Sequence, residues 1–330
     1  MAQIIPVLFY YIGRYASTLS MEDVLRNMKW PLLFAVVCGL YFFVQPPAWY
    51  MQMKMDQTHS GTTDFSLLSI FRLSSFWGHP YQIGYATLLF LAYLMYGYIS
   101  NGAVARNKFS QYVMIAICII CLLLAQLRVT IAVALLMLFY FIFMLKKDSA
   151  GALFKTTLIA AVIVAGVIYY IISSGTEAST YIIEHTAMIF NQDEYIDRFE
   201  HTAGGITEYS MFGNGFGRYG FVARETGGWA LVDHEFQRHL AELGYLGISF
   251  LSLILLFTGK QCIMKKELTL ETGVFFFFFI AMFGASILSN EHQYNFIFWF
   301  CLGKIWNNKY IVRKPIEVYE RKNNCSNGNI

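Results

Sequence analysis

Some arginines in this sequence are placed where they could bind an anion. Arg128 lies in a short polar turn, 126–130, between two long apolar runs. An ionisable residue in such surroundings is costly and is usually kept because it has a partner or lines a cavity. Its guanidinium offers a fixed fork of donors that matches phosphate oxygens. We therefore expect Arg128 to contact a phosphate or diphosphate, with anchoring among lipid headgroups as the alternative.

A histidine that could move a proton is the second candidate. His234 lies about one helical turn before an apolar run that begins near residue 237. A histidine has a pKa of about 6.5, so it can accept a proton from a hydroxyl at neutral pH. The alternative is a helix-start residue bonded to backbone. His234 and His239 are five residues apart and do not align on one helix face, so we expect no metal site. Arg238 and Glu242 are four apart, and we expect them to pair on a helix.

A glycine-rich stretch, MFGNGFGRYG at 211–220, precedes this histidine. It contains the spacing GxGxxG, but no buried strand precedes it, so we reject a dinucleotide-binding loop. Glycine lets backbone approach another group closely. We expect Gly213, Gly215 and Gly217 to shape a tight loop near a ligand.

The elements that position these residues follow from composition. The chain has 330 residues, of which 57% are hydrophobic and 14% charged, whereas soluble domains usually carry about 25% charged residues. Lipid is therefore the expected solvent. Runs of roughly 20 apolar residues can span a bilayer. We predict an all-α, polytopic membrane helix bundle of about eight or nine transmembrane helices, forming one domain over 1–330. The predicted spans lie near 30–48, 80–99, 110–127, 129–145, 156–173, 237–258, 272–289 and 293–308, with 2–17 as a weaker ninth.

Charge placement predicts the orientation of the spans. Lysines gather in alternate connections and in the tail 309–330, and such connections face the cytoplasm by the positive-inside rule. The segment 173–236 instead holds ten Asp or Glu, three Arg and no Lys. We therefore expect 173–236 to be one large extracytoplasmic loop and the C-terminal tail to be cytoplasmic.

Four stretches together resemble the O-antigen ligase and O-antigen polymerase superfamily. DHEFQRHLAELGYLGI at 233–248 resembles the family pattern H-N-x-x-L-x-x-L-A-E-x-G-x-x-G, which ends its large periplasmic loop. MFGNGFGRYG resembles the glycine stretch before it, QLRVTIAVALLML the "S-R-T" start of a span, and RLSSFWGHPYQIG the "R-x-x-G" stretch of an earlier span. The matches keep the family order over about 70–250. Glu235 stands where the family often has Asn, and Leu127 where it has Ser.

This resemblance implies glycosyl transfer on the outer face of the bacterial inner membrane, without a cofactor or metal. The donor would be an undecaprenyl-diphosphate-linked glycan and the acceptor a glycan hydroxyl, with no nucleic acid involved. By motif, Arg128, Arg198 and Arg72 would bind the diphosphate, and His234 would assist the acceptor. A chain-length regulator and a flippase are candidate partners. We favour a polymerase of O-antigen, capsule or exopolysaccharide repeat units. The alternatives are a ligase passing glycan to lipid A core or another acceptor, and a transporter or flippase of lipid-linked sugar.

Overall fold

The fold is known from a computed structural model that describes residues 4–52, 73, 80–100, 108–125, 128–144, scattered positions between 154 and 173, 210–215, 219, 235–265, 269–284, 288 and 294–307. Over these residues the structure is helical and contains no β-strand, as predicted. The helices are α1 (Ile4–Tyr15), α2 (Met21–Val44), α5 (Pro80–Ser100), α6 (Lys108–Ala125), α7 (Arg128–Met144), α12 (Glu235–Lys265), α13 (Leu270–Ala281) and α14 (Asn295–Ile305).

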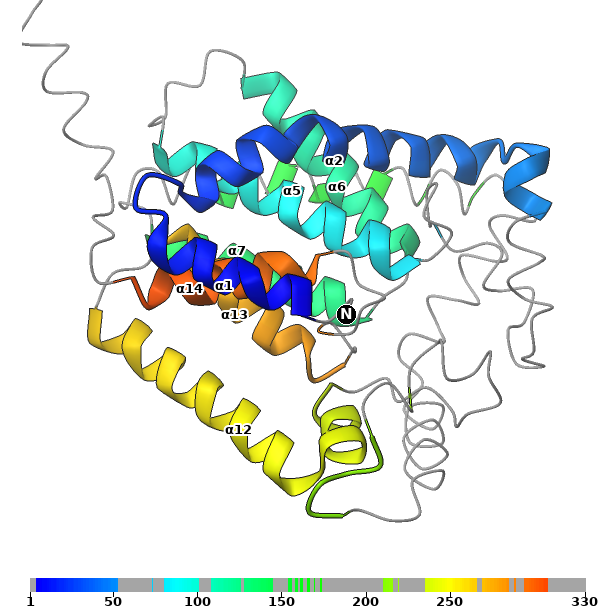
Figure 1. The fold of residues 1–330 in the computed structure, drawn as a ribbon. Coiled ribbons are helices and arrows are strands. Elements are labelled where there is room, and N and C mark those ends of the chain that lie inside the picture. The colour runs from blue at the N-terminus through cyan, green and yellow to red at the C-terminus, as the bar shows by residue number, and fades with distance from the viewer. Residues whose placement is uncertain are drawn as a thin grey trace, which may run out of the picture.

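The helices form two packed groups with a third element beside them (Figure 1). In one group α5 contacts both α2 and α6; in the other α13 contacts both α7 and α14, and α1 lies along α14. Contacts of α5 with α7 and α13 join the two groups. The core of the second group is aromatic: Phe275 stacks on Phe298 with ring centroids 5.6 Å apart, and both are almost fully buried. Between the groups, Tyr85 of α5 stacks on Phe278 of α13 with centroids 6.3 Å apart. Helix α12 diverges from the groups along much of its length (Figure 1).

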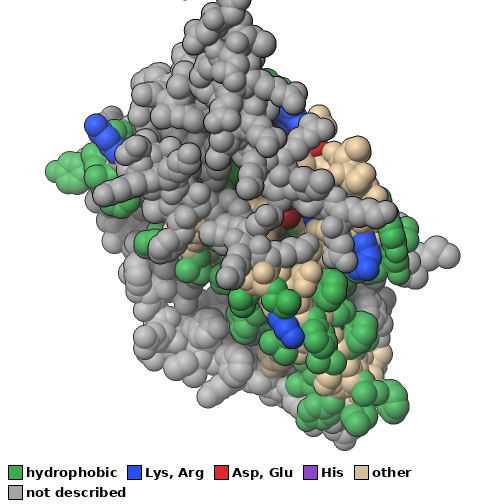
Figure 2. Space-filling model, turned by 90° about the vertical axis from the view of Figure 1, so that its left-hand side faces the viewer, with side chains coloured by type: hydrophobic (Ala, Val, Ile, Leu, Met, Phe, Trp, Pro, Cys, Tyr) green, Lys and Arg blue, Asp and Glu red, His purple; other side chains and the backbone are tan. Residues whose placement is uncertain are grey.

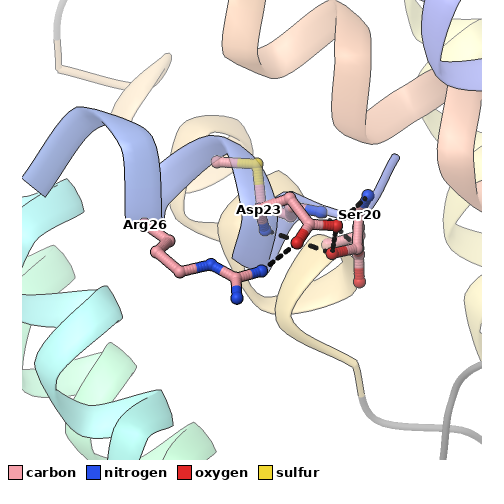
Figure 3. A network of polar contacts seen from close by, with 5 residues as sticks. Ser20, Asp23 and Arg26 are labelled. Carbon is pink, nitrogen blue, oxygen red and sulfur yellow. Dashed lines mark hydrogen bonds and ion pairs between the residues drawn. The ribbon is translucent and has the colours of Figure 1, made fainter. Parts of the chain in front are cut away.

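Helix α2 begins well before the predicted span at 30 because Ser20 caps it (Figure 3). The Asp23 amide donates to Ser20 Oγ at 3.1 Å, and the Ser20 amide donates back to Asp23 Oδ2 at 3.1 Å. This reciprocal capping box satisfies two backbone groups that a bare helix end leaves open. The Ser20 hydroxyl, assisted by Arg26, also holds the pKa of Asp23 below its usual value.

Helices α1 and α14 meet backbone to backbone at two glycines. A Cβ on Gly13 would lie 2.2 Å from the Phe300 carbonyl oxygen, and one on Gly303 would lie 2.1 Å from the Tyr10 carbonyl oxygen. Small residues allow this close approach, which is typical of helices packed in lipid. The two helices therefore pack as one tight pair.

One helix within the described part of the chain, α12, is long and apolar enough to cross a membrane, over Glu235–Met264. Shorter apolar helical stretches cover 113–125, 129–141, 270–281 and 295–305. Much of α12 is exposed, including Phe250, Leu256 and Ile263. Figure 2 shows one side of the molecule, on which hydrophobic side chains make up much of the described surface.

The described helices coincide with predicted spans, although their bounds differ. Helix α13 ends at Ala281, earlier than the predicted 289, and a turn follows over 282–284. Most of the predicted span 156–173 and of the loop 173–236 lies outside the described residues. The number of membrane crossings and the large loop stay predictions.

Candidate functional site

The first two turns of α12 carry a polar face that is almost entirely buried. Glu235, Arg238, His239 and Glu242 occupy positions i, i+3, i+4 and i+7, which places them on one side of the helix. Glu235 is 0% exposed, and Arg238 and Glu242 are 4% exposed. The His239 side chain is the most open, at 18%. Burying so many charged groups is unfavourable unless they are paired. This face is therefore the most chemically unusual part of the described structure.

Glu235 fixes the amino end of α12 to the chain that follows α13. Its amide donates to the Met282 carbonyl at 3.2 Å, and its carboxylate Oε2 accepts the Leu288 amide at 2.7 Å. The ring of Phe236 packs on Phe283 with centroids 4.9 Å apart. The other carboxylate oxygen, Oε1, lies 2.9 Å from His239 Nδ1. His239 Nδ1 also lies 3.0 Å from the Glu235 carbonyl oxygen. Glu235 thus holds the chain by hydrogen bonds, and the hydrogen-bond partner of the histidine ring is its carbonyl oxygen, since Oε1 makes no hydrogen bond within the described residues.

Arg238 and Glu242 form the ion pair predicted from their spacing, which confirms that prediction. Arg238 Nε donates to Glu242 Oε1 at 3.2 Å, and the Tyr219 amide donates to the same oxygen at 3.3 Å. Arg238 Nη1 is buried and has no hydrogen-bond partner within the part of the chain that the structure describes. An unsatisfied buried donor costs about 1–3 kcal/mol, more when charged. Among the described residues, that guanidinium nitrogen therefore lacks the partner that a buried charged donor needs.

The glycine-rich loop packs against a break in α12 at Gly244, where φ is 68° and ψ is −166°. The break frees two carbonyls and two amides of the helix. Backbone of 210–215 satisfies all four: Asn214 N to Ala241 O at 2.9 Å, Gly215 N to Glu242 O at 3.1 Å, Tyr245 N to Ser210 O at 3.2 Å, and Leu246 N to Met211 O at 3.2 Å. We call this arrangement the kink clamp. It fastens the loop to α12.

Glycine is required on both sides of the kink clamp. A Cβ on Gly213 would lie 2.3 Å from the Glu242 carbonyl oxygen. One on Gly244 would lie 2.4 Å from both the Gly213 nitrogen and the Ser210 oxygen. Positive φ at Gly213 (76°), Gly215 (102°) and Gly244 (68°) adds a second reason for glycine. The described close contacts of Gly213 are thus with α12. A role for Gly213, Gly215 and Gly217 beside a ligand stays a prediction, and Gly217 lies outside the described residues.

The other predicted site residues are only partly covered by the structure. Arg128 is the first residue of α7, but its side chain is not described. His234, Arg198 and Arg72 lie outside the described residues.

Neighbours of two predicted residues nevertheless meet around one turn of the chain, 282–284. Val129, next to Arg128, packs on Gly284, where a Cβ would lie 2.1 Å from Val129 Cγ2. Glu235, next to His234, bonds Met282. The start of α7 and the start of α12 therefore lie at the same end of the bundle.

Leu73, next to Arg72, belongs to the same end through α6. Its amide donates to the Leu124 carbonyl at 3.2 Å, near the carboxyl end of that helix. It also packs in a small core with Ala125, three residues before α7 begins. The chain beside Arg72 is therefore tied to the α6–α7 connection.

Sequence reasoning did not assign a chemical role to Glu235 or His239. The available signal was two interleaved pairs with four-residue spacing, 235/239 and 238/242, at a helix start. Within the described residues, no group of three or more His, Cys, Asp or Glu side chains lies together as a metal site would require.

Comparisons with known proteins give no further assignment. Searches of protein-family models, of curated proteins and of solved structures found no match to this chain.

Proposed function

We propose that this chain is a polytopic membrane protein of eight or nine spanning helices, with its C-terminus in the cytoplasm and 173–236 outside. The length and apolar surface of α12 support a place in the bilayer. Contacts between helix ends also support the orientation. Ends assigned to the cytoplasm by charge meet one another, as where Tyr140 Oη donates to the Thr269 carbonyl at 2.7 Å. Ends assigned to the outside meet around 282–284.

We further propose that the protein is a glycosyltransferase of the outer face of the bacterial inner membrane. It would polymerise undecaprenyl-diphosphate-linked repeat units of an O-antigen, capsule or exopolysaccharide. In this reaction a hydroxyl of the acceptor glycan attacks the anomeric carbon of the donor glycan. The bond from that carbon to the diphosphate oxygen breaks, and the diphosphate leaves with the electron pair.

One observation carries the proposal: the starts of α7 and α12 share the turn 282–284. That arrangement brings the chain at Arg128 and the chain beside His234 to one end of the bundle, although they are about a hundred residues apart in sequence. An arginine that stabilises the leaving diphosphate and a histidine that assists the acceptor must act on one substrate complex. Arg72 and Arg198 are the further diphosphate-binding candidates.

The experiment is polymerisation by the purified full-length protein with lipid-linked repeat units. We expect Arg128→Lys to lose most of the rate, because lysine keeps the charge but lacks the guanidinium fork. Arg106→Lys, in a connection predicted to be cytoplasmic, is the matched control and should keep the wild-type rate. Equal rates in both variants would reject the role of Arg128, and no polymer from the wild type would reject the proposed activity.

A deletion strain separates a polymerase from a ligase. Loss of a polymerase leaves single repeat units on the final acceptor. Loss of a ligase leaves finished polymer on the lipid carrier. Only the first outcome supports the polymerase.

A further inference from the structure

The buried polar face of α12 has a charge balance that favours taking up a proton. It holds two carboxylates, Glu235 and Glu242, against one guanidinium, Arg238. With the fourth member, His239, neutral, the face carries one excess negative charge. Protonation of the imidazole balances it. In surroundings of low dielectric constant, balancing opposite charges stabilises the fold much more than it would in water.

The tautomer of His239 follows from its neighbours. Nδ1 faces two oxygen atoms, Glu235 Oε1 at 2.9 Å and the Glu235 carbonyl oxygen at 3.0 Å. Both are acceptors, so Nδ1 must carry a hydrogen. The neutral ring then has its lone pair on Nε2. Both contacts with Glu235 are made by Nδ1, and His239 is the most open member of the face.

Glu235 is itself held rigidly, which makes it suited to orient the ring. Its Oε2 accepts the Leu288 amide at 2.7 Å, and its own amide is bonded to Met282. Tyr85 on α5 is close enough to Glu235 to interact with it electrostatically. A buried carboxylate 2.9 Å from Nδ1 can form an ion pair with the ring once the imidazole is protonated, and so stabilise its protonated form.

From this geometry we propose that His239 is the general base of the transfer reaction and that Glu235 is its positioning residue. His239 Nε2 takes the proton of the acceptor hydroxyl as that oxygen bonds to the anomeric carbon of the donor. The bond to the diphosphate breaks at the same carbon, and the electron pair leaves with undecaprenyl diphosphate. This inference rests on the proposed function. It differs from the sequence prediction, which gave the proton to His234.

An anion site at the same face is the less favoured interpretation. Arg238 Nη1 has no hydrogen-bond partner among the described residues and could contact a phosphate oxygen. However, two carboxylates on the same face repel an anion, and they outnumber the guanidinium. Arg238 is better suited to a neutral sugar hydroxyl, which would satisfy Nη1 without adding negative charge.

The test is the pH dependence of the polymerisation rate for purified full-length variants. A general base must be deprotonated, so the wild-type rate should rise with pH to a plateau. His239→Asn keeps a donor at the Nδ1 position but removes Nε2. We expect it to lower the plateau about 10²- to 10⁴-fold and to abolish the rise. Glu235→Gln keeps the size and should move the midpoint of the rise to lower pH, because the carboxylate no longer stabilises the imidazolium.

Two further variants decide between the histidines. His185→Gln, in the predicted outer loop and without an assigned role, should match the wild type. His234→Asn should lower the rate but keep the rise with pH. The assignment of His239 is overturned if the rate of His239→Asn still rises with pH, and most clearly so if His234→Asn has lost that rise. If the wild-type protein shows no polymerisation, the proposed function is rejected and the inference with it. If the wild type is active and His239→Asn has the same rate and pH dependence, the inference alone is rejected.

Discussion

Replacing Gly244 by alanine should open the kink clamp. At φ 68° and ψ −166° the residue occupies backbone space that is essentially restricted to glycine. Forcing alanine into it costs about 1–3 kcal/mol. The new Cβ would also lie within 2.5 Å of three backbone atoms of the loop, so the loop must move. If two of the four clamp hydrogen bonds break, at about 0.5–1.5 kcal/mol each, the total cost is about 2–6 kcal/mol.

Alanine substitutions at two other glycines separate the cost of backbone strain from the cost of steric overlap. Gly215 has φ 102° but nothing within 4 Å of its Cβ position, so alanine there should cost the strain alone, about 1–3 kcal/mol. Gly259, on the same helix as Gly244, has ordinary helical geometry and open space. Alanine is favoured over glycine in helices by about 1 kcal/mol, so Gly259→Ala should be neutral or slightly stabilising.

Thermal unfolding of the detergent-purified variants measures the order of stability, with Gly244→Ala lowest and Gly259→Ala highest. Limited trypsin digestion reports on the loop itself, because Arg218 is a cleavage site within it and Arg224 is one just after it. Gly244→Ala should be cut faster there than Gly259→Ala. If these two variants melt at the same temperature and are cut at the same rate, the kink clamp does not hold the loop and the reasoning is wrong.

Three further outcomes follow from other contacts. Ser20→Ala removes the cap of α2 and should destabilise the protein by about 1 kcal/mol, measurable by thermal unfolding. The pKa of Asp23 is lowered in the fold, chiefly by the Ser20 hydroxyl. Its contribution to stability is therefore present above the unfolded-state pKa of about 4 and is lost as the pH falls further. The difference in melting temperature between wild type and Ser20→Ala should narrow in acid to the part due to the Ser20 acceptor, and a constant difference would contradict this. Gly303→Ala places a Cβ 2.1 Å from the Tyr10 carbonyl oxygen and should release α1, lowering the melting temperature, whereas Gly97→Ala, with open space around it, should not.

Apolar runs were enough to predict where the helices lie. Helix α5 at 80–100 and helix α7 at 128–144 each lie within a residue of the predicted bounds, since long apolar stretches are strong signals. The predicted helix bounds were wrong where a specific side chain or turn, rather than hydropathy, decides where a helix begins or ends. Helix α2 starts at Met21 because of the Ser20 cap, and α13 stops at Ala281 with a turn after it.

The site was predictable only where the interaction is local. The Arg238–Glu242 pair follows from a four-residue spacing, and the structure contains it. The partner of the glycine-rich loop was not predictable, because the break at Gly244 lies inside what sequence treats as one continuous helix. The contact of Glu235 with Leu288 joins residues 53 apart and has no sequence pattern. Such long-range contacts are set by tertiary packing rather than by periodicity.

The tight pairing of α1 with α14 has a consequence for the order of assembly. The first described helix, α1, packs on the last described one, 295–305, and the Met21 amide donates to Glu271 at 2.9 Å. During synthesis the chain must therefore be made as far as α14 before the backbone-contact partner of α1 exists. Contacts between such distant segments form late because closing the chain costs entropy. Docking of α1 on α14, at the two ends of the described chain, is thus the step that completes the helix bundle.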